Sequence, residues 1–98
     1  MPYTLTSLDF EPLLDNDFKV LHDGNPVRLT LSALDIMEDR HSAPGARQSF
    51  SLTFLGPLEP LLPQGIYTLN NEALGSIDLF MVPLGPLEKE QRYEIVMN

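Results

Sequence analysis

The sequence predicts an all-β domain with minor α content: a small antiparallel β-barrel or sandwich of six to seven strands with one short N-terminal helix. Nine prolines and six glycines divide the chain into short segments. Several segments alternate apolar and polar residues, which is the period of a strand with one buried face. Short strands between Gly and Pro turns are typical of sandwiches and barrels, and the lack of long helical segments argues against a βαβ fold.

The length and composition indicate one globular unit. The chain has 98 residues, and we interpret 1–98 as a single β-rich domain, because domains commonly contain about 100–150 residues. Apolar residues make up 43% and charged residues 20%, a globular composition rather than a disordered one. The chain has no cysteine. Disulfides, thiol catalysis and cysteine-ligated metal sites are therefore excluded.

The chain is strongly acidic, with 6 basic and 14 acidic residues and a formal net charge of −8. Such a surface repels nucleic acid and anionic membrane leaflets, so we expect neither as a partner. The first residues lack the basic and apolar regions of a signal peptide. No apolar run approaches the roughly 18 residues of a membrane span. These features predict a cytoplasmic location.

The first predicted element is a brief helix over about residues 7–14. Thr6 and Asp9 have the spacing of a capping box, with Asp in place of the usual Glu. The apolar side chains of this segment are expected to cover one end of the core: Leu8, Phe10, Leu13 and Leu14.

A hairpin follows, with extended segments at 17–22 and 27–31 around a turn at 23–26. The inward positions then change parity, because Leu29 and Leu31 are odd whereas Leu34 and Ile36 are even. One extra residue near Ser32 would restore the inward direction, so we favour a β-bulge there. A helical turn capped by Ser32 is the alternative.

Residues 38–48 show no apolar periodicity and predict an exposed loop. Arg40, His41 and Arg47 make it the only locally cationic segment, although Glu38 and Asp39 offset that charge. The loop is a candidate contact for an anion or an acidic partner. Further strands are predicted at 49–55, 65–69, 76–84 and 91–97.

The segment 76–84 is apolar on both faces, with Ile77, Leu79 and Met81 on one side. The opposite side carries Phe80, Val82 and Leu84. Such a strand lies between two layers or against a second subunit. We select Ile77, Leu79 and Met81 as the candidate apolar contact.

An identical pentapeptide, Leu-Gly-Pro-Leu-Glu, occurs at 55–59 and again at 84–88. We interpret the two copies as similar corners: Gly-Pro ends each strand, and the following leucine folds back into the core. A duplicated binding loop is the alternative.

No motif for phosphate binding or for a nucleophilic serine is present, and His22 and His41 are not in a zinc-binding pattern. We therefore predict no catalytic residue, no cofactor and no metal centre. Asp15, Asp17 and Asp23 offer oxygen ligands, but their spacing is not that of an EF-hand. A cation site at these three residues is left open.

Several motifs resemble an uncharacterised bacterial domain family of unknown function. They are Phe-x-Pro-Leu-Leu at 10–14, Leu-Pro-Gln-Gly-x-Tyr at 62–67, Leu-Phe-x-Val-Pro-Leu-Gly at 79–85 and Tyr-Glu-x-Val at 93–96. The resemblance covers nearly the whole chain and implies a small β-rich domain, with a weak association with proteins resembling phage-tail collars. Where it implies a glycine after Leu14, this chain has Asp15.

These observations favour a non-enzymatic module that works through protein–protein contact or self-association. Its contact residues would come from the Arg40–Arg47 loop and the apolar strand 76–84, or from an exposed strand edge. The alternative is a small-ligand-binding or hydrolytic β-barrel with a site near Tyr67, Tyr93 and His22. That alternative requires a concave pocket with converging polar groups.

Overall fold

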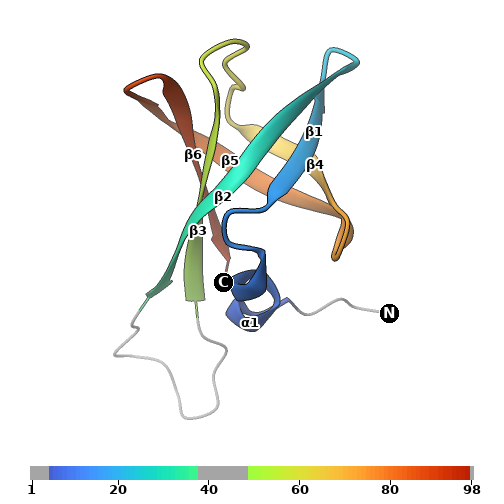
Figure 1. Cartoon of the computed structure of the whole chain (residues 1–98), viewed down its shortest axis with the longest axis vertical. Helices are drawn as coiled ribbons and strands as arrows, with labels where there is room; N and C mark the ends of the chain where they lie inside the picture. The colour runs from blue at the N-terminus through green and yellow to red at the C-terminus, as the bar shows by residue number, and fades with distance from the viewer. Residues whose placement is uncertain (1–4, 38–48, 98) are drawn as a thin grey trace.

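The computed structural model describes residues 5–37 and 49–97, and these form a closed antiparallel barrel (Figure 1). The strands follow one another around the barrel in the order β1-β2-β3-β6-β5-β4. The predicted fold class, a small β-barrel with a short N-terminal helix, is therefore confirmed. The strands are β1 (Asp17–His22), β2 (Asn25–Met37), β3 (Ser49–Pro57), β4 (Gly65–Asn71), β5 (Gly75–Leu87) and β6 (Glu90–Met97).

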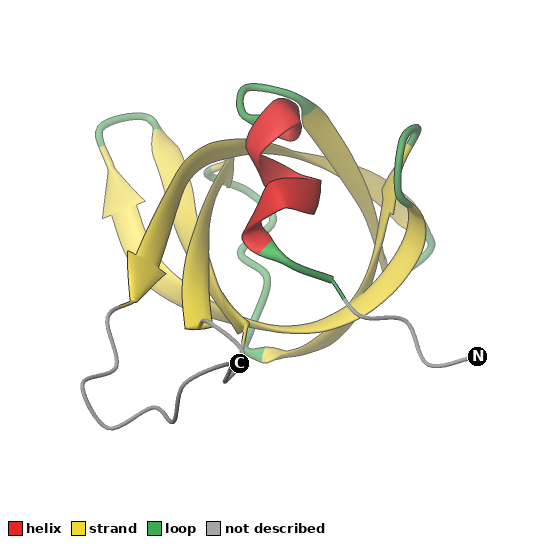
Figure 2. Cartoon of the chain, turned by 90° about the horizontal axis from the view of Figure 1, so that it is seen from below, coloured by secondary structure: helices red, strands yellow, loops and turns green. Residues whose placement is uncertain are grey.

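Two short helical turns cross one end of the barrel, α1 (Ser7–Phe10) and the 3₁₀ turn η1 (Glu11–Leu13) (Figure 2). The predicted capping box is present at Thr6 and Asp9, and the Asp9 carboxylate accepts a hydrogen bond from the Thr6 backbone N–H at 2.8 Å. The α-helix is shorter than expected because Pro12 has no N–H to donate to the preceding turn. None of the described helices is long and apolar enough to cross a bilayer.

Only part of this segment covers the core as expected. Phe10 and Leu13 are buried, whereas Leu8 is 72% exposed and Leu14 is also exposed. Asp15 then takes a positive φ of 68°, a conformation that favours glycine and that Asp tolerates better than most residues. The position where the resemblance implies glycine is therefore one whose backbone suits glycine.

The longest strands, β2 and β5, each pair with two neighbours in succession. β2 pairs with β1 over its first half and with β3 from Thr30 onward. The register shifts between Leu31 and Ala33. This shift confirms the predicted bulge over the helical turn.

The predicted strand breaks at the two Gly-Pro pairs are wrong, because β3 extends to Pro57 and β5 to Leu87. Gly85 allows the second strand to continue through a register shift, with a φ of 97°. Both prolines lie near strand ends, where only β6 pairs with the strand. Proline is tolerated there because a strand side without a ladder partner needs no N–H.

The two pentapeptide copies flank the same part of β6. Gly56 lies opposite Gln91 on one side, and Pro86 lies opposite Gln91 on the other. The leucines that follow, Leu58 and Leu87, are 43% and 57% exposed, so the expectation that they fold into the core is wrong. Leu62, from the linker between β3 and β4, is fully buried instead.

The barrel interior is filled by apolar side chains, as expected for a barrel this small. Phe18 and Phe54 contact edge to face with ring centroids 5.1 Å apart, and Phe10 contacts Phe50 at 5.8 Å. The other fully buried large side chains are Leu29, Leu31, Leu52, Leu62, Leu69, Met81, Tyr93 and Ile95.

Candidate functional site

The first half of β5 leaves one strand edge without a ladder partner among residues 5–37 and 49–97. Residues 75–81 pair with β4, and pairing with β6 begins only at Val82. The end of β6, from Ile95 to Met97, pairs with β3 alone. The two strands therefore diverge, and a groove of about 400 Å³ lies beside the divergence.

This groove, which we call the β5 groove, is mainly apolar. Its described lining comprises Leu5, Leu74, Ser76, Ile77, Asp78, Leu79 and Met97, and Asp78 is the only charged residue among these. Ile77 and Leu79 are half-buried and pack against the core. The β5 groove thus combines apolar side chains with a backbone edge that no other described strand pairs with.

The three apolar residues selected from 76–84 do not share one environment. Ile77 and Leu79 line the β5 groove, whereas Met81 is fully buried. Met81 lies opposite Gly65, at the end of the β4 ladder. Its side chain is part of the core and is not on the surface of the isolated chain.

The opposite face of β5 is exposed. Phe80 is 53% exposed and lies directly across from Ile66 of β4, which is 74% exposed. The sequence indicated Phe80 as a candidate because the segment 76–84 is apolar on both faces. Ile66 could not be selected from the sequence, because only the β4–β5 register shows that it lies beside Phe80 on the same face.

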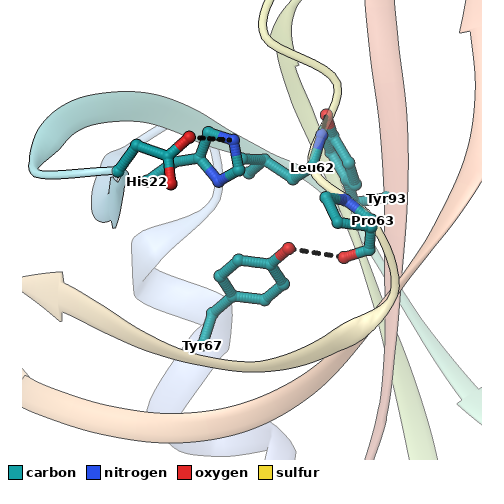
Figure 3. Close-up of polar contacts among 6 residues, drawn as sticks. His22, Leu62, Pro63, Tyr67 and Tyr93 are labelled. Carbon is teal, nitrogen blue, oxygen red and sulfur yellow. Dashed lines mark hydrogen bonds and ion pairs between the residues drawn. The ribbon is translucent and has the colours of Figure 1, made fainter.

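The hydroxyls of the two tyrosines proposed for the alternative site both hold the β3–β4 linker (Figure 3). The Leu62 backbone N–H donates to the Tyr93 hydroxyl at 3.1 Å. The Tyr67 hydroxyl donates to the Pro63 carbonyl. Burial, and secondarily the nearby Tyr93, raise the pKa of Tyr67 above its usual 10.0, so the donor stays protonated at neutral pH.

His22, the third residue of that alternative site, contacts the neighbouring Asp23, with 3.5 Å between Nε2 and Oδ2. Among the described residues no hydrogen bond joins His22 to either tyrosine. The geometry therefore favours structural roles: Tyr67 and Tyr93 position residues 62–63, and His22 lies at the end of the first hairpin.

The structure does not bring Asp15, Asp17 and Asp23 together. Within 5–37 and 49–97, no group of three or more His, Asp or Glu side chains is placed to hold a metal ion. Asp15 and Asp23 have positive φ angles of 68° and 51°, as turn residues often do. Arg40, His41 and Arg47 lie outside the described residues.

A second concave region, which we call the polar hollow, lies between β1 and the β4–β5 turn. Its volume is about 650 Å³, and its lining comprises Leu13, Asn16, Asp17, Lys19, Arg28, Asn70, Asn71, Glu72, Ala73 and Gly75. The β1–β4 ladder beside it has only two pairs, Lys19 with Asn70 and Val20 with Leu69. Sequence reasoning missed this hollow, because its residues come from strands far apart in the chain.

Comparison with known families gives a match over most of the chain. The model of a family described as a domain of unknown function, DUF6916, matches residues 5–97. No curated protein and no solved structure gives a significant match. The family match includes every residue that the structure describes. The chain therefore belongs to the family described as a domain of unknown function, DUF6916, which agrees with the expected membership of an uncharacterised small domain family.

Proposed function

We propose that this domain is a non-enzymatic, cytoplasmic interaction module that binds an extended segment of a protein partner along the β5 groove. The observation that carries the proposal is the edge of residues 75–81, which has no ladder partner within 5–37 and 49–97 and lies beside an apolar lining. A strand added to such an edge gains backbone hydrogen bonds, and its alternate side chains enter the groove. An assembly or accessory role fits this mode of binding.

Charge indicates the chemistry of the partner segment. The chain carries a formal net charge of −8, and Asp78 is the charged residue of the groove. Asp78 is exposed and accepts a hydrogen bond from the Thr68 hydroxyl. The partner segment therefore alternates apolar and polar residues and carries a basic side chain opposite Asp78.

The test selects short random peptides against the immobilised full chain and measures the affinity of the enriched peptides. We expect basic peptides with alternating apolar residues. Asp78→Arg should weaken their binding by about tenfold, the effect of replacing an attractive charge pair with a repulsive one. The matched control is Asp35→Arg, the same change at an exposed position of β2 outside the groove.

The Asp35→Arg variant should bind the peptides with an affinity within about twofold of that of the unchanged chain, since distant surface charges are screened. Two results would contradict the proposal: no enrichment of alternating apolar peptides, or equal loss of binding in both variants.

Self-association is a second candidate, favoured by the exposed pair Ile66 and Phe80. Sedimentation velocity at increasing protein concentration tests it. We expect association that Phe80→Ser abolishes. A monomer at every concentration would reject it.

A further inference from the structure

An outward row of polar side chains crosses three strands at the edge of the polar hollow. Lys19 of β1 lies directly opposite Arg28 of β2 on one side and Asn70 of β4 on the other. All three are exposed. Cross-strand partners have Cβ atoms about 5 Å apart on the same face of the sheet, so the ends of these side chains can converge on one group.

Two cations lie side by side in this row, on a chain with a formal net charge of −8. The described residues contain four lysines and arginines: Lys19, Arg28, Lys89 and Arg92. Lys19 and Arg28 line the polar hollow. Like charges directly opposite each other destabilise a sheet. The Asp17 carboxylate beside Arg28 offsets part of this repulsion, and a bound anion near Lys19 would offset more of it.

Several hydrogen-bond donors of Lys19, Arg28 and Asn70 have no partner among the described residues. The Lys19 ammonium has no ion pair or hydrogen bond within the described part of the chain. Arg28 faces Asp17 through its Nε, at 3.5 Å from Oδ2. This contact orients the guanidinium and leaves its terminal N–H groups for a ligand.

The Asn70 amide is oriented in the same way. Its Oδ1 accepts a hydrogen bond from the Ser76 hydroxyl of β5. Its Nδ2 has no hydrogen-bond partner within the described part of the chain, so this amide keeps two N–H donors for a ligand. Asn71 holds the walls together: its Nδ2 donates to the Asp17 carbonyl at 3.2 Å, and its Oδ1 accepts the Ala73 N–H at 2.8 Å.

We infer that the polar hollow binds an oxyanionic group, a carboxylate or a phosphoryl group, between Lys19, Arg28 and Asn70 Nδ2. The ammonium and the guanidinium supply charge-assisted hydrogen bonds, and the amide supplies a neutral one. Asp17 and Glu72 also line the hollow and oppose an anion, so they limit the affinity. This site does not depend on the β5 groove or on its partner.

The test is an NMR titration of the ¹⁵N-labelled full chain with inorganic phosphate, and separately with succinate, at constant ionic strength. We expect saturable shifts at the Asn70 side-chain amide and at the backbone amides of Lys19 and Arg28. A stronger response to phosphate assigns a phosphoryl ligand, and a stronger response to succinate assigns a carboxylate.

Variants sharpen the assignment. Lys19→Met should lower the affinity about tenfold, the usual size for one charge-assisted hydrogen bond. Glu72→Gln should raise affinity by about twofold to threefold by removing an opposing charge. The matched control, Lys89→Met, removes the same charge from an exposed turn outside the hollow and should leave affinity unchanged.

Three results would overturn the inference. Shifts that rise linearly without saturation would indicate no site. Shifts centred on residues outside the hollow would place the site elsewhere. An equal loss of affinity in Lys19→Met and Lys89→Met would reduce the effect to net charge.

Discussion

The β5 groove and the polar hollow lie on opposite edges of the same β4–β5 hairpin, yet their linings are opposite in character. On the β4 edge the ladder to β1 has two pairs, and on the β5 edge residues 75–81 have none among the described residues. The hollow is lined mainly by exposed polar residues, whereas the groove is lined mainly by half-buried apolar ones. The two regions both lie where strand pairing is incomplete, but they differ in polarity because different faces of the strands line them.

The turn between the two strands separates the two regions residue by residue. Ala73 and Gly75 line the polar hollow, and Leu74 and Ser76 line the β5 groove. Ser76 also donates to Asn70 in the outward row. The comparison predicts that changes to the apolar interior affect stability strongly, whereas changes to the hollow affect mainly ligand binding.

Leu69→Ala should have the largest effect. Leu69 is fully buried and lies opposite Val20 in the short β1–β4 ladder. Removing it leaves a cavity in the core and should lower the free energy of unfolding by about 2–5 kcal/mol. Urea denaturation measures the loss of stability. Faster hydrogen exchange at Val20 would locate that loss at the β1–β4 ladder.

The control for that variant is Ile66→Ala on the same strand, at a position that is 74% exposed. It should change stability by less than about 0.5 kcal/mol. Equal losses in the two variants would contradict the greater contribution of the buried Leu69 to stability.

Tyr93→Phe comes next in size. Tyr93 is 1% exposed, and its hydroxyl accepts the Leu62 N–H. Without that acceptor a buried N–H has no partner, which costs about 1–3 kcal/mol. Thermal unfolding measures this change. Tyr67→Phe, which removes the exposed hydrogen bond from β4 to Pro63 of the same linker, should cost less. The reverse order would show that the linker is held mainly from β4.

Lys19→Met should produce a small gain. Removing one of two cations that lie directly opposite each other should stabilise the sheet by about 0.2–1 kcal/mol in the absence of an anion. The gain should shrink at high salt, because exposed charges are screened. Urea denaturation at low and high salt checks it. A loss of stability at both concentrations would mean that Lys19 serves the fold rather than a ligand.

The smallest effect concerns pH. The pKa of Tyr67 is raised above its usual 10.0, mainly by burial. The unfolded chain then releases this proton at lower pH than the folded one, so the stability from the neutral hydroxyl is complete below pH 10 and is lost as pH rises through the higher folded pKa. Denaturation across alkaline pH should show this decline, and Tyr67→Phe should remove part of it. An unchanged slope in that variant would assign the decline to other groups.

Much of the local structure follows from short-range patterns. Period-two alternation located β1 and β6 correctly, and the parity change between Leu31 and Leu34 revealed the bulge in β2. Gly-Pro was misleading, because a proline at a strand end needs no ladder partner on its open side. The pattern at 55–58 therefore resembles a corner, while the structure continues the strand to Pro57.

The sites were harder to predict, because each depends on register between distant strands. Alternation alone showed that β5 has two apolar faces, but only packing decided that Met81 lies inside and Phe80 outside. The pairing of Lys19 with Asn70 needs the barrel to close between β1 and β4.

By itself, the amino-acid sequence determined the class of fold, the acidic surface and the positions of most strands, since these depend on composition and on neighbours within a few residues. Only the tertiary structure decided which leucine fills the core, which face of β5 is exposed and which polar residues share the hollow. The physical reason is that burial and cross-strand contact depend on how the barrel closes, and closure is a property of all six strands together.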